Sequence, residues 1–279
     1  MQRRTVLTKS TAVLVGLMYS SMVRAQDLNP YLRARPLICA HRGWTSPSGT
    51  ENSLTQMRQT HQAGPFMMEI DLAKTADGTI MLMHDREVDR VTTGHGLFSA
   101  LTDARIATLR LRNGHGTPRD PVPTYDKVLQ WAAATPDALL MLDIKDVSPH
   151  DALQPVQQRG LSERIVVLTF KKQQAREAFA ADPKALISVL VTQPQDLEAY
   201  AGMAAGRQFA AYIPQNSPPS LFQAAHAKGA VIITDLLGPT AIMDAVSPNE
   251  GAHRAHFLPI DILVTNTPLK LRAALAHQL

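Results

Sequence analysis

The chain of 279 residues contains a single cysteine, Cys39, so it cannot form an internal disulfide bond. This scarcity excludes small scaffolds that depend on disulfides and zinc sites built from several cysteines. Cys39 lies in the apolar run Pro36-Leu37-Ile38-Cys39-Ala40, and no neighbour in the sequence would activate its thiol. We therefore expect a buried structural cysteine rather than a nucleophile.

Glycine and proline are also scarce, with 15 and 19 residues, whereas 45% of the chain is hydrophobic. This composition excludes a collagen-like or disordered protein, because enough apolar surface is present to build a large packed core. The length suits one α/β barrel domain as well as two smaller domains.

An excess of charge of one sign is confined to the N-terminus. Four of the 28 basic residues and none of the 24 acidic residues lie in the first 25 positions, so the chain from Gln26 onward holds 24 of each. A neutral chain has no general electrostatic attraction for nucleic acid or for an anionic membrane surface. We therefore expect neither as a partner.

Apolar runs long enough to span a bilayer are absent as well. The run Thr11–Tyr19 follows basic residues and precedes Val23-Arg24-Ala25, which is typical of a cleavage site. Residues 1–25 are thus predicted to be a cleavable export signal, which makes the mature protein periplasmic or secreted, with no stable membrane anchor. Arg3-Arg4 with the two apolar residues after Thr5 resembles the twin-arginine motif, so the general secretory and twin-arginine routes both fit.

From residue 26 to residue 279, short apolar runs alternate with helical segments. Runs that are apolar on both faces are typical of parallel strands covered by helices. Eight alternations predict a single α/β domain with a (β/α)8 TIM barrel fold, and a doubly wound open sheet is the alternative. The predicted strands are Leu37–His41, Met67–Leu72, Leu139–Ile144, Ile165–Phe170, Leu186–Val191, Ala210–Pro214, Val231–Asp235 and Ile262–Val264. The predicted helices include Ser53–Ala63, Lys127–Ala134, Lys171–Ala181 and Ser220–Lys228.

One short connection departs from this alternation. The turn Lys74–Gly78 contains Asp-Gly and is followed directly by the apolar segment Thr79–His84, so the two flanking strands must form an antiparallel hairpin. The next stretch, Thr92–Pro123, is rich in glycine and proline. It predicts a small loop-rich insertion over one end of the barrel, in a place suited to a substrate lid.

Carboxylates gather where two predicted strands end, at the rim on which barrel enzymes carry their active sites. Glu69 and Asp71 are two residues apart on a strand, so both side chains point to the barrel axis, and Asp143 and Lys145 repeat this spacing. Three inward carboxylates are too costly to leave unpaired. A hard divalent cation, Mg²⁺ or Ca²⁺, satisfies such an all-oxygen set, which predicts a metal site.

Two histidines and two basic residues are expected beside this site. His41 and His84 follow two different strands, and a pair of imidazoles can divide the acid and base roles of a hydrolysis. Arg42 and Lys145 add positive charge that suits phosphate oxygens. Together with a cation, these groups favour cleavage of a phosphodiester over acyl transfer. Taken alone, each motif has a plainer explanation, and for Lys145 it is an ion pair with Asp143.

Several spaced motifs resemble one known family. They are His41-Arg42-Gly43, Glu51-Asn52, Glu69-Ile70-Asp71, Thr75-Ala76-Asp77-Gly78, His84-Asp85, Pro123-Thr124-Tyr125 and Leu142-Asp143-Ile144-Lys145. In this order they are similar to the signature of the glycerophosphodiester phosphodiesterase family, a TIM-barrel family of phosphoric diester hydrolases. Beyond this region the likeness is limited to the alternation of strands and helices.

The resemblance implies hydrolysis of a small glycerophosphodiester to sn-glycerol 3-phosphate and an alcohol, with a divalent cation, Ca²⁺ or Mg²⁺. It also implies roles for individual residues. The acid–base pair is His41 and His84, the metal ligands are Glu69, Asp71 and Asp143, the phosphate contacts are Arg42 and Lys145, and Glu51 is a metal ligand or lies just behind the ligands. Members of the family usually carry Glu where this chain has Asp143.

Two alternative functions stay open at this point. A phospholipase D-type enzyme of the same superfamily would act on lysophospholipids or sphingomyelin and would need a wide apolar mouth. Trp44, Leu97, Phe98 and Leu101 could line such a mouth, although packing of the insertion on the barrel also explains them. The second alternative is a non-catalytic barrel that binds phosphodiesters, which retention of both histidines and three carboxylates disfavours.

Overall fold

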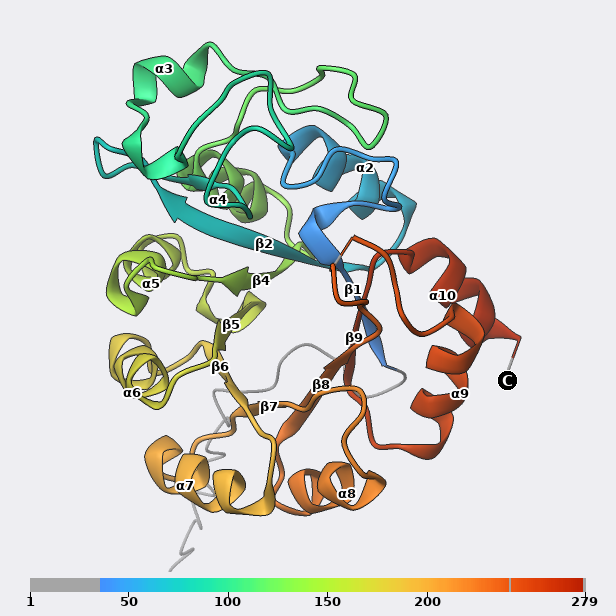
Figure 1. Cartoon of the computed structure of the whole chain (residues 1–279). Helices are drawn as coiled ribbons and strands as arrows, with labels where there is room; N and C mark the ends of the chain where they lie inside the picture. The colour runs from blue at the N-terminus through green and yellow to red at the C-terminus, as the bar shows by residue number, and fades with distance from the viewer. Residues whose placement is uncertain (1–35, 241, 278–279) are drawn as a thin grey trace, which may run out of the picture.

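A computed structural model of the chain describes residues 36–240 and 242–277, and the predicted export signal lies outside them. Eight parallel strands form a closed barrel, because β1 pairs with β2 on one side and with β9 on the other. The strands are β1 (Leu37–Ala40), β2 (Met67–Lys74), β4 (Leu139–Asp143), β5 (Ile165–Thr169), β6 (Leu186–Leu190), β7 (Ala210–Tyr212), β8 (Val231–Asp235) and β9 (Ile262–Thr265). The predicted TIM barrel is confirmed, and the open sheet is excluded (Figure 1).

Helices surround the barrel, and their first residues are typical of helix starts (Figure 1). Five begin with proline in the first turn, and four are capped by a Ser or Thr hydroxyl that accepts a backbone N–H three residues further on. They are α2 (Leu54–Ala63), α4 (Tyr125–Ala134), α5 (Pro149–Gln158), α6 (Lys172–Ala181), α7 (Pro194–Ala204), α8 (Pro219–Ala227), α9 (Pro248–Phe257) and α10 (Pro268–Ala276). None of the described helices is both long and apolar enough to cross a membrane.

Two apolar layers stabilise the barrel. One lies between the strands and the helices, and the other fills the inside of the barrel with side chains such as Met67, Met141 and Ile233. Cys39 belongs to the inner layer and is fully buried, which confirms the expected structural thiol.

Several strands end one or two residues before their predicted ends, and His41 is the example that matters for the site. Strand β1 ends at Ala40, because the chain turns at His41–Gly43 into a short 3₁₀ segment in which Arg42 has φ +52°. The residues predicted as strand ends but found outside the strands are His41, Ile144, Phe170, Val191 and Pro214.

The predicted hairpin is confirmed, since β3 (Ile80–Leu82) runs antiparallel to the end of β2. After it, the insertion contains the short helix α3 (Asp103–Ala107) and several isolated bridges, and it lies beside β2 and α4 (Figure 1). It is more compact than a loop-rich sequence suggests because it has a small apolar core of its own. This core contains Phe98, Ile106, Leu109, Leu111 and Val122 of the insertion, packed with Met81, Met83, Val88 and Val91 from β3 and the loop after it.

We expect Gly43→Ala to destabilise the protein strongly. Gly43 has φ +69°, and a Cβ there would lie 2.6 Å from Cγ of Met57. The left-handed backbone should cost roughly 1–2 kcal/mol and the overlap about as much again. Gly78→Ala is the matched control, because Gly78 has φ +85° but open space around it. Urea unfolding should show a larger loss of unfolding free energy for Gly43→Ala than for Gly78→Ala. Equal losses would show that the overlap with Met57 does not contribute.

Candidate active site

Three carboxylates meet at the carboxyl-terminal end of the barrel. Glu69 and Asp71 come from β2 and Asp143 ends β4, and the register places Asp143 directly opposite Asp71. Each offers an oxygen that lies within 4.8 Å of the oxygens of the other two, so the three side chains are close enough together to bind one metal ion. Glu69 and Asp71 are buried, and neighbouring carboxylates on adjacent strands repel each other.

The electrostatics of this group indicate a shortage of positive charge. Burial, and then the charges of Asp71 and Asp143, raise the pKa of Glu69 well above its usual value. Burial and the charge of Asp71 likewise raise the pKa of Asp143. At Asp71 burial also acts upward, but Lys145, His84 and Arg42 outweigh it and lower the pKa to about 2. A hard divalent cation with oxygen ligands fits this donor set and would relieve the repulsion.

Lys145 is the nearest cation to these carboxylates. Its Nζ lies 2.9 Å from Oδ1 of Asp71 and 3.0 Å from Oδ2 of Asp143. Burial alone would lower the pKa of Lys145, but the two carboxylates outweigh it and raise the pKa above its usual value. The ion pair with Asp143 considered from the sequence is therefore present, and it is shared with Asp71.

Arg42 faces the interior rather than the open mouth. Its side chain is 1% exposed, and Nη1 donates to both oxygens of Glu51 at 3.0 Å. Its backbone N–H donates to Oε2 of Glu69 at 2.7 Å, which the left-handed turn at Arg42 makes possible. Nε of Arg42 makes no hydrogen bond and lies 4.0 Å from Oδ2 of Asp71. The side chain predicted to contact phosphate thus supports the carboxylates in this structure.

The hydrogen bonds of His41 determine which of its nitrogens carries the proton. Oδ1 of Asn266 lies 2.9 Å from Nδ1 of His41 and 3.2 Å from Nε1 of Trp44. The indole N–H can only donate, so the shared atom must be the amide oxygen, and Nδ1 of His41 must donate to it. Nε2 therefore keeps its lone pair, and it lies 3.9 Å from Oε2 of Glu69. Burial, and then the charge of Arg42, lower the pKa of His41 to about 4, so the ring is neutral at neutral pH.

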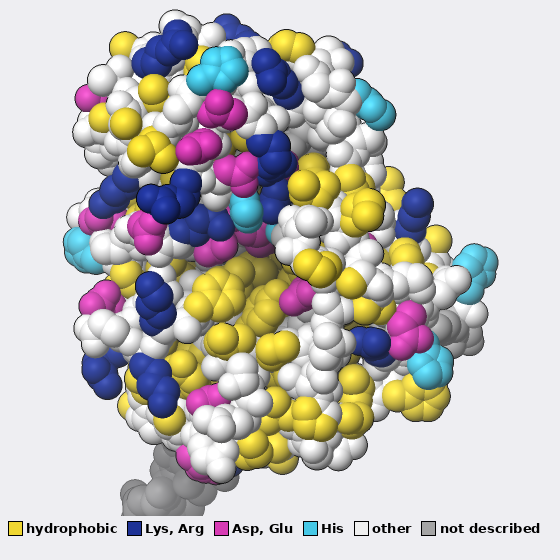
Figure 2. All heavy atoms as spheres, in the orientation of Figure 1, with side chains coloured by type: hydrophobic (Ala, Val, Ile, Leu, Met, Phe, Trp, Pro, Cys, Tyr) yellow, Lys and Arg dark blue, Asp and Glu magenta, His cyan; other side chains and the backbone are white. Residues whose placement is uncertain are grey.

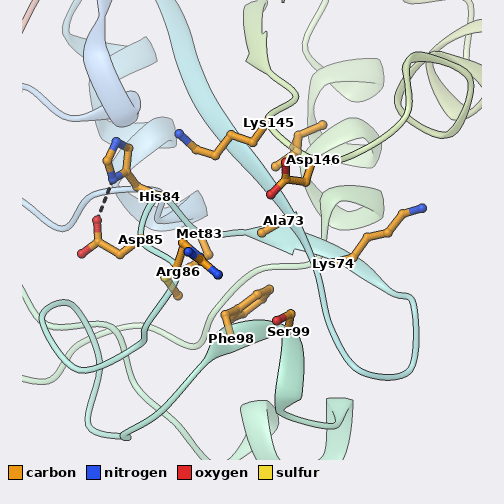
Figure 3. A pocket seen from close by; sticks show the side chains of 11 residues that line it. Ala73, Lys74, Met83, His84, Asp85, Arg86, Phe98, Ser99, Lys145 and Asp146 are labelled. Atoms are coloured by element: carbon orange, nitrogen blue, oxygen red, sulfur yellow. Dashed lines mark hydrogen bonds and ion pairs between the residues drawn. The ribbon is translucent and has the colours of Figure 1, made fainter. Parts of the chain in front are cut away.

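His84 has a different environment. It lies two residues after β3, its side chain is 30% exposed, and Oδ1 of Asp85 is 2.6 Å from its Nδ1 (Figure 3). The hydrogen bonds from His84 and Arg90 outweigh burial and hold the pKa of Asp85 well below its usual value. An ionised partner at Nδ1 orients the ring and stabilises a positive charge on it, as in hydrolases that pair His with Asp.

A cavity of about 200 Å³ opens beside His84 and Lys145, between the end of β2 and the insertion (Figure 3). His84 and Lys145 form part of its lining, whereas the three carboxylates do not. Its lining residues are Leu72, Ala73, Lys74, Met83, His84, Asp85, Arg86, Phe98, Ser99, Lys145 and Asp146.

Glu51 lies outside the carboxylate cluster. Both of its oxygens accept hydrogen bonds from Arg42, and both also accept from Arg90 at 2.8 Å. In this structure it contacts the cluster through Arg42. Arg90 and Asn266 are two site residues that the sequence did not reveal. Arg90 is the second of two arginines that follow His84-Asp85, and Asn266 lies in a Thr-Asn-Thr-Pro segment.

Of the residues considered for an apolar phospholipase mouth, Phe98 alone lines the cavity beside His84, and most of the set is buried or partly buried. Trp44 and Phe98 are each 2% exposed and Leu101 packs on the core of the insertion, which leaves only Leu97 of that set largely exposed. Figure 2 shows a charged region with imidazole groups beside a hydrophobic region in the middle of the barrel. Phe170, which is 44% exposed and 6.0 Å from the ring of Tyr212, belongs to the β5–β7 side.

Comparison with known proteins identifies one family. The model of the glycerophosphoryl diester phosphodiesterase family matches residues 41–268. Glycerophosphodiester phosphodiesterase 1 of Bos taurus is 42% identical over 105 residues, which cover 36% of this chain and 30% of the bovine protein. The chain thus matches less than half the length of such mammalian relatives.

Two solved structures show the same fold. A glycerophosphoryl diester phosphodiesterase from Parabacteroides distasonis superposes with a TM-score of 0.75 at 22% identity, covering 88% of this chain and 87% of that one. A phosphodiesterase from Oleispira antarctica, in complex with the product sn-glycerol-3-phosphate, superposes with a TM-score of 0.71 at 18% identity, covering 88% and 99%.

Proposed function

Because the chain belongs to the glycerophosphoryl diester phosphodiesterase family, we propose that it hydrolyses glycerophosphodiesters to sn-glycerol 3-phosphate and an alcohol. The observation that carries this proposal is the meeting of three carboxylates, two differently paired imidazoles and Lys145 at one end of the barrel. The product bound by the Oleispira antarctica relative supports the choice of substrate class.

Glu69, Asp71 and Asp143 would hold the divalent cation, Mg²⁺ or Ca²⁺. When bound, such an ion supplies positive charge that stabilises the phosphoryl oxygens in the transition state. Lys145 adds to this charge: its ammonium has three N–H donors, two directed to Asp71 and Asp143, so one can donate to a phosphate oxygen. Arg42 contributes through its fixed charge and by holding Glu69 with its backbone N–H.

The two histidines divide the proton transfers. His41 is the base, because its Nδ1 donates to Asn266 and its Nε2 is left with a lone pair that can accept the proton of the attacking oxygen. His84 is the acid, because Asp85 stabilises the charged ring, whose Nε2–H can be donated to the leaving alcohol oxygen. The cavity beside His84 gives that alcohol room.

A panel of diesters on the chain lacking residues 1–25 tests the activity. We expect release of sn-glycerol 3-phosphate from glycerophosphocholine and other small diesters in the presence of Mg²⁺ or Ca²⁺. Choline release from lysophosphatidylcholine, with none from glycerophosphocholine, would support the phospholipase D-type alternative instead. Inertness toward every diester, including bis(p-nitrophenyl) phosphate, with each metal would favour a binding protein.

We also propose that the protein acts in the periplasm or outside the cell, on the basis of the export signal predicted over residues 1–25. Expression of the full chain with N-terminal sequencing of the exported product should give Gln26 as the first residue. A mature protein that retains Arg3 and Arg4, or that stays inside the cell, would contradict this location.

Asp143 and Lys145 should respond differently when each is replaced. Asp143→Ala removes one of three oxygen ligands, so we expect metal affinity to fall roughly 10-fold or more. Lys145→Met removes a competing cation from Asp71 and Asp143, so metal affinity should not fall, while kcat falls or KM rises through the lost phosphate contact. Calorimetric titration with Mg²⁺ and Ca²⁺ measures both. Unchanged metal affinity in Asp143→Ala would show that Asp143 is not a metal ligand.

A further inference from the structure

The loop between β3 and the insertion supplies one side chain, Arg90, that joins two parts of the active site. Arg90 donates from Nε to Oδ2 of Asp85 at 2.5 Å. Its two terminal nitrogens donate to the two oxygens of Glu51, each at 2.8 Å. A guanidinium that bridges two carboxylates in this way uses its rigid planar geometry, which a lysine cannot reproduce.

Each of the two carboxylates has a further partner in the site. The other oxygen of Asp85 accepts from Nδ1 of His84 at 2.6 Å. Glu51 accepts from the buried Arg42, whose backbone N–H donates to the predicted metal ligand Glu69. A continuous row of hydrogen-bonded groups therefore runs from His84 to the carboxylate cluster, and Arg90 lies within it.

The two ends of this row differ in how firmly they are held. His84 and Asp85 follow β3 in a loop, and their side chains are 30% and 26% exposed, so no strand pairing fixes their orientation. Glu51 is buried with Arg42, and Asn52 beside it exchanges hydrogen bonds with Asp71 on β2. Glu51 on the barrel side is thus held rigidly, whereas the orientation of the loop that carries His84 depends on side-chain contacts.

We propose that Arg90 is a positioning residue, which holds Asp85 and, through it, the imidazole of His84 in the orientation that protonates the leaving alcohol. This proposal rests on the proposed function, in which His84 is the acid. Arg90 itself transfers no proton. It fixes Asp85 to Glu51, and thereby fixes the loop after β3 to the barrel at the point where the acid lies.

The dependence on the leaving group distinguishes positioning from other roles. A choline alkoxide is a poor leaving group and needs a proton, whereas p-nitrophenolate leaves with little proton assistance. Arg90→Ala should lower kcat about 10- to 100-fold on glycerophosphocholine, with KM changed less than about 3-fold. On a glycerol p-nitrophenyl phosphodiester the same variant should lose less than about 3-fold. Arg90→Lys should recover only part of the loss, because one ammonium replaces a bidentate group.

Arg105→Ala is the matched control, since Arg105 is an exposed arginine of the insertion whose side chain donates to Thr108, away from the site. It should leave both rates unchanged. Asp85→Asn weakens the same hydrogen bonds at Asp85, the partner of both Arg90 and His84. It provides a second test if Arg90→Ala does not fold. It should reproduce the loss on glycerophosphocholine alone, and combining it with Arg90→Lys should add little, because the two residues act as a unit.

Three outcomes would overturn the proposal. Equal losses on both substrates would make Arg90 a direct contact of the phosphate, and no loss on either would make it a surface ion pair only. Fully additive losses in the variant that combines Asp85→Asn with Arg90→Lys would show that the two residues act independently. Failure of the proposed function is distinguishable from all three, because the wild-type protein would then hydrolyse neither diester.

Discussion

Exhaustive chelation should reduce turnover of glycerophosphocholine to background, and Mg²⁺ or Ca²⁺ should restore it. The reason is the charge of the site: Glu69, Asp71 and Asp143 lie within 4.8 Å of one another, with Lys145 as the nearest cation. Three carboxylates so close together give the site negative charge, so in the absence of a divalent ion it is poorly suited to receive an anionic phosphodiester.

A second measurement reports metal binding without turnover. A ligand present at 100 times its dissociation constant stabilises the folded state by about 2.7 kcal/mol, so Mg²⁺ or Ca²⁺ should raise the Tm of the wild-type protein. Glu69→Gln keeps the shape of the side chain, and this variant should lose most of the turnover restored by metal and most of the rise in Tm. Asp126→Asn, at an exposed position of α4, is the control that keeps them. Full turnover after chelation, with no metal found by elemental analysis, would overturn the prediction.

Asp143 bears on which of the two ions works better. Its side chain is one methylene shorter than Glu, so its oxygen reaches about 1.5 Å less far toward an ion between the strands. Mg²⁺ demands short, near-ideal octahedral contacts, whereas Ca²⁺ accepts longer and more variable ones. Lengthening the side chain with Asp143→Glu should therefore favour Mg²⁺ relative to Ca²⁺ in the same titration.

The parts of the site that lie on strands could be predicted from the sequence. The two-residue spacing of Glu69 and Asp71 places both side chains on one face of any strand, and the alternation of strands and helices predicts that all strand ends meet at one rim. The same argument applies to Asp143, which the structure pairs with Asp71 in register. These inferences need only local geometry and the fold class.

The partners of these residues could not be predicted in the same way. Asn266 reaches His41 across 225 positions of sequence, and Arg90 reaches Glu51 across 39, so neither contact leaves a local pattern. The direction of Arg42 depends on its left-handed backbone, which the adjacent Gly43 does not predict. Side chains in turns and loops are placed by such tertiary contacts, which explains why Glu51 could not be assigned from its position in the chain.

Replacing the two histidines should lower kcat by about 10² to 10⁴ each on glycerophosphocholine, the usual range for loss of an acid or base. The different partners of the two rings predict how these losses depend on the substrate. His84→Ala should lose far less on a p-nitrophenyl diester, because that leaving group needs little help from an acid. His41→Ala should lose about equally on both substrates, because the attacking oxygen must be deprotonated in either case.

His115→Ala, at an exposed position of the insertion, is the control and should leave both rates unchanged. Thermal unfolding measures whether both variants fold, because His84 is part-exposed but His41 is buried just beyond the end of β1. The reverse pattern, with His41→Ala sensitive to the leaving group and His84→Ala insensitive, would exchange the two roles. Near-normal turnover of glycerophosphocholine by either variant would show that the replaced histidine is neither the acid nor the base. The loss measured for His84→Ala is also the upper limit for Arg90→Ala, because a residue that acts only through His84 cannot contribute more than His84 itself.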